Sequence, residues 1–121
     1  MATFADYSGA DYDVRMTQGD TFSEQILMED GDGDAIDLTG YTFRSQLRRT
    51  ADGAVVAEFA MSTDLPSSTV TRTLNAAITA GLSGTYVHDF QWTNPSGQVR
   101  TLFSGEFEIG PEVTRCVTFV R

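Results

Sequence analysis

Large apolar and polar residues alternate over residues 84–109, and this alternation constrains the fold more than any other feature of the sequence. Tyr86, Phe90 and Trp92 fall at even positions, and Asp89 and Gln91 stand between them. Successive side chains of an extended chain point to opposite faces, so one face of this segment is aromatic and the other is polar. Residues 94–97, Asn-Pro-Ser-Gly, then favour a turn, after which the alternation resumes. The segment therefore predicts a β-hairpin with its aromatic face in a core.

Shorter alternating runs occur at residues 22–28, 41–48 and 55–61, and Asp52-Gly53 between the last two is a strong hairpin signal. The only helix-like segment is short, at residues 75–82. Turns spaced by about 8–12 residues between alternating runs are typical of two packed antiparallel sheets. We therefore predict an all-β fold: an immunoglobulin-like antiparallel β-sandwich with at most one short helical turn. An extended N-terminal arm is expected over residues 1–11, and a single β-sandwich domain over residues 12–121.

Several positions within the predicted strands carry specific expectations. His88 has the parity of the aromatic face, so it is expected to be packed and hydrogen-bonded. Gly105 stands where a large residue would continue the pattern, which suggests a bulge or a close backbone approach. Four arginines are predicted to face outward, where they form a solvated mixed-charge surface, salt bridges with acidic neighbours, or contacts with a partner's carboxylates: Arg44, Arg48, Arg49 and Arg72.

The charge balance narrows the classes of partner. Seventeen acidic residues against eight basic ones give a formal net charge of −9. An acidic surface repels nucleic acid, whose binding requires cationic neutralisation of phosphates. No run of about 18 apolar residues and no leader pattern is present in the sequence, so neither a membrane span nor a signal peptide is expected. The single cysteine, Cys116, excludes an internal disulfide framework.

Candidate chemistry is sparse. Asp30, Asp32 and Asp34 are spaced like the opening of a calcium loop and are weak metal candidates. The glycine and glutamate that such a loop needs at its sixth and twelfth places are replaced by Ala35 and Tyr41, so a solvated turn is the favoured interpretation. His88 and Cys116 lack the neighbours of a nucleophilic site, and no phosphate-binding loop is present. We therefore expect no catalytic residues, no enzyme activity, no cofactor and no small-molecule substrate.

The two ends of the chain are the expected partner contacts. Phe4 and Tyr7 are aromatic residues in the predicted arm and can anchor on another protein. Val117, Phe119 and Val120 lie in the final segment, RCVTFVR, which either completes a sheet edge or adds to the sheet of a neighbouring subunit.

Three segments also carry a family resemblance: residues 19–22 (GDTF), residues 36–43 (IDLTGYTF), and residues 84–115, which run from GTY to VTR. Together they resemble small tailed-bacteriophage structural proteins, similar to the long-tail-fibre-associated β-sandwich domain and the N-terminal domain of phage upper baseplate proteins. The resemblance implies a virion protein made in the host bacterial cytoplasm. Its partners would be other virion proteins in multiple copies, and its function that of an adaptor between tail and fibre components.

Two alternatives remain open at this point. A capsid decoration, or cement, protein can use the same sandwich and arm. A carbohydrate-binding module would use Tyr86 and Trp92 as a sugar platform, which requires both rings on the solvent face, whereas the alternation places them in the core.

Overall fold

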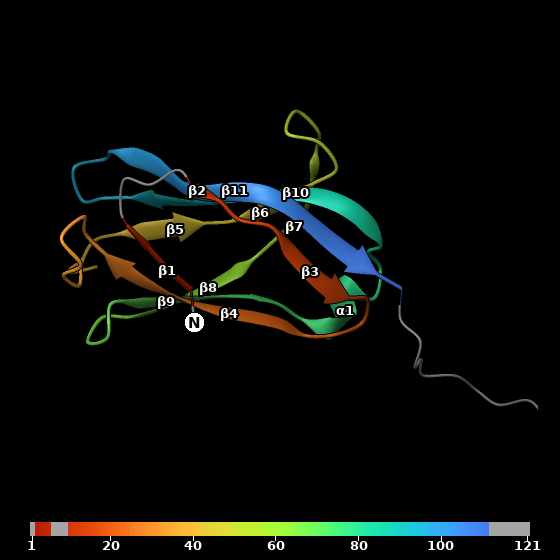
Figure 1. Cartoon of the computed structure of the whole chain (residues 1–121), viewed down its shortest axis with the longest axis horizontal. Coiled ribbons are helices and arrows are strands. Elements are labelled where there is room, and N and C mark those ends of the chain that lie inside the picture. Colours follow the sequence, from red (N-terminus) through yellow and green to blue (C-terminus); the bar gives the residue numbers. More distant parts are fainter. Residues whose placement is uncertain (1, 6–9, 112–121) are drawn as a thin grey trace, which may run out of the picture.

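Two packed β-sheets form the molecule in the computed structural model, which describes residues 2–5 and 10–111 (Figure 1). Within these residues the smaller sheet has the order β1-β4-β9-β8 and the larger one β2-β11-β10-β6-β7, with β3 beside β11 and β5 beside β10. The predicted immunoglobulin-like all-β sandwich is thereby confirmed. The elements are β1 (Ala2–Ala5), β2 (Ala10–Asp11), β3 (Val14–Thr17), β4 (Phe22–Glu29), β5 (Thr42–Arg44), β6 (Gln46–Arg48), β7 (Val55–Glu58), β8 (Ala60–Asp64), β9 (Thr69–Leu74), α1 (Ala76–Thr79), β10 (Gly84–Thr93) and β11 (Val99–Gly110).

The hairpin of β10 and β11 is the longest strand pair and follows the predicted alternation. Tyr86, Phe90 and Trp92 are 1%, 0% and 5% exposed, so their rings belong to the core. The pairing is antiparallel, with a shift of register between Phe90 and Gln91. Two apolar clusters fill the space between the sheets, one around Phe90 and Trp92 and the other around Tyr86. The aromatic platform required of a carbohydrate-binding module is therefore absent at Tyr86 and Trp92.

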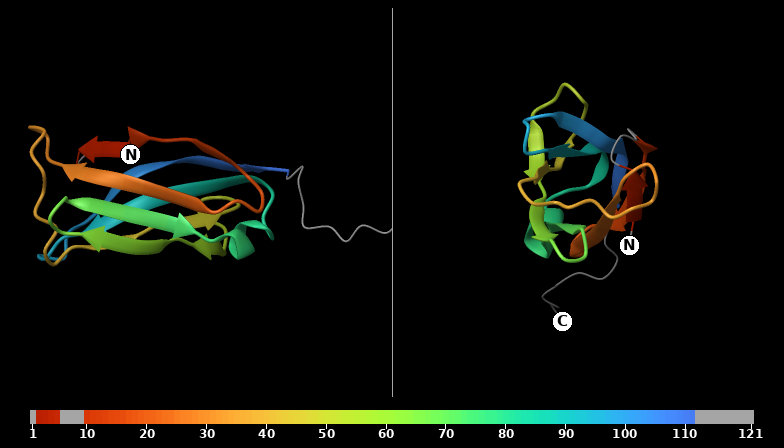
Figure 2. Two further views of the ribbon diagram at one scale, coloured as in Figure 1. Left: turned by 90° about the horizontal axis from the view of Figure 1, so that it is seen from below. Right: turned by 90° about the vertical axis from the view of Figure 1, so that its left-hand side faces the viewer.

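The chain changes sheets at both edges of the sandwich. Residues 2–5 of the predicted arm form β1, which pairs in parallel with β4, and β2 and β3 then pair in parallel with β11. At the opposite edge, residues 55–61 do not form the single strand that their alternation predicts. The chain passes from β7 in the larger sheet to β8 in the smaller one at Phe59, whose backbone N–H donates to the Ser45 carbonyl at 2.9 Å. Figure 2 shows both edges end-on.

Gly105 marks a close backbone approach, as its place in the alternation indicated. A β-carbon at this position would overlap the carbonyl oxygen of Tyr12 and lie 2.7 Å from Oδ1 of Asp13. The strand can therefore receive the segment between β2 and β3 against its backbone only because residue 105 has no side chain.

The short helix α1 begins at Asn75, whose side chain accepts a hydrogen bond from the backbone N–H of Ile78 at 2.9 Å. It occupies one end of the sandwich (Figure 1). Across residues 2–5 and 10–111, no helix is long and apolar enough to cross a membrane.

Candidate functional site

A groove lies on the outer face of the larger sheet, where the outward-facing side chains of β6, β10 and β11 meet the β6–β7 hairpin. Its volume is about 540 Å³. A second hollow of about 420 Å³ shares Gln46, Arg48, Ala51 and Asp89 with it, so the two form one continuous trough, called here the outer groove. The lining residues with charged or polar side chains that bear on its chemistry are Asp13, Arg44, Gln46, Arg48, Asp89, Gln91, Thr101, Ser104 and Glu106.

Asp89 is the acidic residue among the four that line both hollows of the outer groove. Alternation along β10 turns it outward, between the inward-facing His88 and Phe90. Burial raises the pKa of its carboxyl group, although a backbone hydrogen bond from Gln46 and the charge of Arg48 act in the opposite direction. Asp89 is in none of the three ion pairs formed within the described residues. It is therefore a half-buried acid that a cationic ligand group would stabilise in its charged form.

The two long walls of the outer groove differ in charge. Arg44 and Arg48 stand on the wall made by β5 and β6, but both are engaged within the protein. Arg44 pairs with Glu58 at 3.5 Å. Arg48 donates to Oε1 of Gln46 at 2.9 Å and to the carbonyl of Gly53. The opposite wall carries Asp13 and Glu106, both exposed, so the rim of the groove is acidic on that side.

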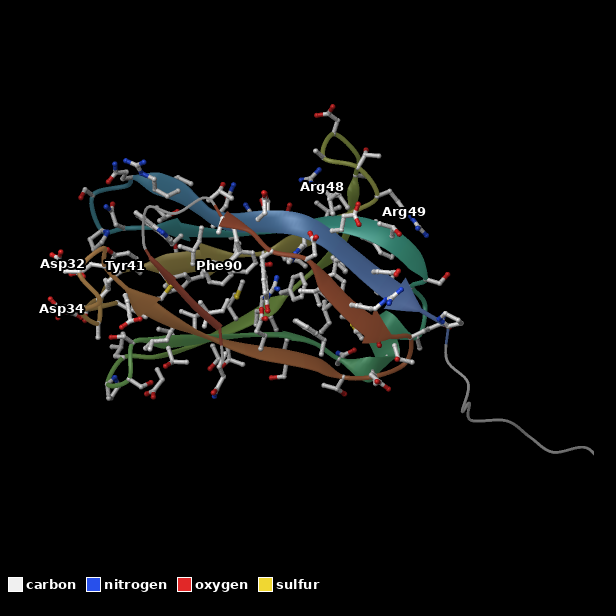
Figure 3. The ribbon with its side chains drawn as sticks, viewed as in Figure 1. Asp32, Asp34, Tyr41, Arg48, Arg49 and Phe90 are labelled. Carbon is white, nitrogen blue, oxygen red and sulfur yellow. The ribbon has the colours of Figure 1, made fainter. Side chains whose placement is uncertain are left out.

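Three of the four arginines predicted to face outward are on the surface. Figure 3 shows Arg48 and Arg49 beside the β6–β7 hairpin, at the top of the molecule. The Arg49 guanidinium lies over the Tyr86 ring at 4.2 Å from its centroid. Arg44 is exposed and forms the ion pair described above.

The outward prediction for Arg72 is wrong, because this side chain is fully buried. Its Nε donates to Oε1 of Glu24 at 2.7 Å, across the register pair that joins β9 to β4. Burial lowers the pKa of Arg72, and the charge of Glu24 opposes that shift. Position 72 has the parity of Val70 and Leu74, two core residues, so the alternation itself indicated burial.

Arg72 also connects the two sheets. Its Nη1 donates to Ser45 Oγ at 3.1 Å and to Nδ1 of His88 at 3.0 Å. The guanidinium lies over the rings of Phe59 and Phe103, at 4.6 and 4.8 Å from their centroids. Within the described residues its Nη2 has no hydrogen-bond partner. The aromatic rings around the guanidinium provide cation–π attraction in place of water.

His88 is packed between aromatic rings and hydrogen-bonded at both nitrogens, in agreement with its predicted place in the core. Since Nδ1 accepts from Arg72, Nε2 carries the proton and donates to the Tyr12 carbonyl at 2.6 Å. Burial and the charge of Arg72 lower the pKa of His88 from 6.5 to about 4. Both nitrogens are thus occupied by structural hydrogen bonds, which leaves neither free to act as a general base.

Tyr12 completes the buried network formed by Arg72, Glu24, Ser45 and His88. Its hydroxyl donates to Oε2 of Glu24, and its ring packs edge-on against Phe103 at 5.0 Å. Burial, together with the neighbouring Glu24 carboxylate, raises the pKa of Tyr12 to about 12. The network therefore holds one acid and one cation in ion-paired form between the sheets.

The metal candidates Asp32 and Asp34 lie on a turn at the end of the sandwich that is remote from α1 (Figure 3). Asp30 belongs to the same turn, where its backbone N–H donates to the Asp34 carbonyl at 2.8 Å. Oδ1 of Asp30 accepts the backbone N–H groups of Asp32 and Asp34, at 2.9 and 3.0 Å. Gly33 has φ of +85°, which glycine adopts without strain. This carboxylate serves the turn itself. In the part of the chain that the structure describes, no group of three or more His, Cys, Asp or Glu side chains is placed to hold a metal ion.

Among the predicted partner contacts, Phe4 lies in β1, opposite Met28 in the register with β4. The other four, Tyr7, Val117, Phe119 and Val120, lie outside the described residues, as does Cys116. The outer groove was not predicted from the sequence. Its signal was the outward parity of the polar residues Asp89 and Gln91, to which the alternation gave no role.

Comparison with known proteins gave little. No protein-family model matches the chain, and no curated protein matches it. Among solved structures, the chain is similar to CopC from Methylosinus trichosporium OB3b, with 14% sequence identity, coverage of 88% of this chain and 89% of that chain, and a TM-score of 0.48.

These findings correct the family resemblance drawn from the three sequence segments. No family model and no curated protein supports the resemblance, and the solved structure named above is CopC. The predictions of a phage tail or baseplate adaptor, a capsid decoration protein and a virion location are therefore wrong. Short motifs such as GDTF and IDLTGYTF coincide with turns and strand starts that many β-sandwiches need, for example the Leu38–Tyr41 turn with Gly40 at φ +83°.

Proposed function

We propose that this protein is a non-catalytic binding module that captures a basic polypeptide segment in the outer groove. The observation that carries the proposal is Asp89, a half-buried carboxylate at the centre of the groove. Asp89 forms no ion pair within the described residues, so an arginine or lysine side chain of a ligand would be its direct cationic partner.

The shape and lining of the outer groove suit an extended peptide. Polar side chains of β10 and β11, Gln91, Thr101 and Ser104 among them, offer hydrogen-bond donors and acceptors along its length. Asp13 and Glu106 add negative charge on the rim, which attracts a cationic ligand and raises its association rate. Burying the ligand's charge beside Asp89 gives a charge-assisted hydrogen bond of about 1.5–3 kcal/mol.

The module is proposed to be non-catalytic because the polar groups near the groove that could take part in catalysis already form hydrogen bonds or ion pairs within the protein. Of the candidates for general base chemistry, His88 is hydrogen-bonded at both nitrogens within the core. The arginines that would bind an anionic substrate, Arg44 and Arg48, are engaged by Glu58, Gln46 and Gly53.

The test is a titration with three five-residue peptides of equal length, one containing two arginines, one neutral and one containing two glutamates, followed by backbone NMR shifts. We expect the basic peptide alone to bind, with shifts on β6, β10 and β11. Asp89→Asn should weaken its affinity by about 10–100-fold. Asp32→Asn removes the same charge from the remote turn and should leave affinity unchanged. Equal binding of all three peptides, or equal effects of the two substitutions, would refute the proposal.

A further inference from the structure

The open edge formed by β7 and β8 has the features of a site for strand addition. β7 is the last strand of the larger sheet and β8 the last strand of the smaller one, so within the described residues neither has a neighbour on its outer side. An edge strand of this kind presents backbone donors and acceptors that can pair with another chain. The edge also exposes two adjacent apolar side chains, Val55 and Val56, at 43% and 39%.

Natural edge strands are commonly protected by lysine, proline or inward-pointing charge. Residues 55–64, VVAEFAMSTD, contain neither lysine nor proline, and their two charges are Glu58 and Asp64, both exposed. This edge is therefore acidic at two points six residues apart and otherwise uncharged. Glu58 already pairs with Arg44, but at 3.5 Å and with both side chains exposed, so a second arginine can reach it.

The C-terminal segment, residues 115–121, has the complementary pattern. It reads RCVTFVR, with arginines at both ends, six residues apart, and no acidic residue. Residues 1–114 hold six arginines and all seventeen acids, a formal charge of −11, whereas residues 115–121 carry +2. Between the arginines stand valine, threonine and phenylalanine, which have high β propensity.

We propose that residues 115–121 of a second copy of this chain add to the β7–β8 edge as a strand, with Arg115 and Arg121 opposite Asp64 and Glu58. Repeated head to tail, this contact is heterologous, so it links copies into a ring or an open chain. The site adjoins the outer groove through Glu58, which contacts Arg44 and Gln46, but the proposal does not depend on the binding function proposed above.

The length of the chain favours a second copy over the chain's own C-terminal segment. In the larger sheet the place beyond β7 is four strand places from β11, about 19 Å at the usual spacing. Arg115, opposite Asp64 of β8, would also have to cross to the smaller sheet, about 10 Å away. Five residue steps separate Gly110, where β11 ends, from Arg115, which is about 18 Å when fully extended. The chain's own segment would thus be fully stretched before pairing begins.

Cys116, the single cysteine, allows a direct test by disulfide trapping. The full chain carrying Thr63→Cys together with Cys116→Ser is mixed with a mass-tagged wild-type chain and oxidised mildly. In the proposed register residue 63 faces Cys116 of the other copy, so we expect a heterodisulfide at least tenfold above that of the control. The control is Ser96→Cys with Cys116→Ser, in the exposed β10–β11 turn.

A charge exchange makes the test specific. Arg115→Glu with Arg121→Glu should abolish the Thr63 product, and adding Glu58→Arg and Asp64→Arg to the cysteine-bearing partner should restore it. Equal trapping at residues 63 and 96, or an intrachain disulfide as the main product of Thr63→Cys in the otherwise wild-type chain, would overturn the proposal. Loss of trapping on Asp89→Asn alone would also overturn it, by placing the segment in the outer groove.

Discussion

The buried ion pair of Arg72 and Glu24 offers the sharpest test of how the two sheets are held together. Arg72 is fully buried, and the Glu24 side chain is 12% exposed. Substituting Arg72 with Met keeps most of the side-chain volume but leaves the Glu24 carboxylate without its cation. Breaking a buried pair by removing one partner costs about 3–5 kcal/mol, because an uncompensated charge remains in the interior.

The second half of this prediction is the double substitution. Glu24→Gln alone leaves a buried guanidinium uncompensated and is also expected to cost about 3–5 kcal/mol. Arg72→Met with Glu24→Gln leaves no buried charge in the pair, and a glutamine oxygen can still accept from the Tyr12 hydroxyl. The double variant should therefore be more stable than the sum of the single losses predicts, by about 2 kcal/mol or more.

Urea unfolding followed by the fluorescence of Trp92, the only tryptophan, measures these free energies. The matched control is Arg15→Met, which removes one partner of the exposed Arg15–Glu108 pair, where the Arg15 side chain is 82% exposed. Exposed pairs contribute about 0–1 kcal/mol, so this loss should be small. If Arg72→Met costs no more than Arg15→Met, or if the two single losses add without coupling, the network does not hold the sheets as described.

Two further predictions concern the same region. The pKa of His88 is about 4 in the folded protein and 6.5 when unfolded, so its contribution to stability is present above pH 6.5 and is lost as pH falls toward 4. Between pH 7 and pH 4, the free energy of unfolding of the wild type should fall by about 3 kcal/mol more than that of His88→Gln. Equal losses would contradict the burial of His88. Gly105→Ala places a methyl group against the Tyr12 carbonyl and should lower the free energy of unfolding, measured by heat or urea, by about 1–3 kcal/mol. The control Gly97→Ala lies at an open turn with φ +87° and should show only the backbone cost of that conformation. A Gly105→Ala variant as stable as wild type would refute the close approach.

The sequence predicted the parts of the fold that depend on local pattern. Period-two alternation placed Tyr86, Phe90 and Trp92 in the core, and the Asp52-Gly53 pair placed the β6–β7 hairpin. These features depend on residues close together in the chain, where side-chain parity and turn chemistry act directly.

The features that sequence reasoning missed depend on contacts across the sandwich. Arg72 is predicted on the surface, although its parity matches the core. Its burial is stabilised by Glu24, 48 residues away on the neighbouring strand, and by His88, 16 residues away on the other sheet. The change of sheet at Phe59 depends on the Ser45 carbonyl that receives its N–H group. Neither partner can be identified from the local pattern around residues 59 and 72.

The outer groove and the buried network occupy opposite faces of one short stretch of β10. His88 faces inward to Arg72, while Asp89 faces outward into the groove, and the Asp89 backbone carbonyl accepts a hydrogen bond from the Ser45 hydroxyl of the network. Because Ser45 also receives Arg72, the backbone of Asp89 is held by the same group that ties β9 to the larger sheet. A binding carboxylate gains from such support, since a side chain on a fixed backbone loses less conformational freedom when a ligand binds. On this view the buried charges position the groove, in addition to holding the sheets together.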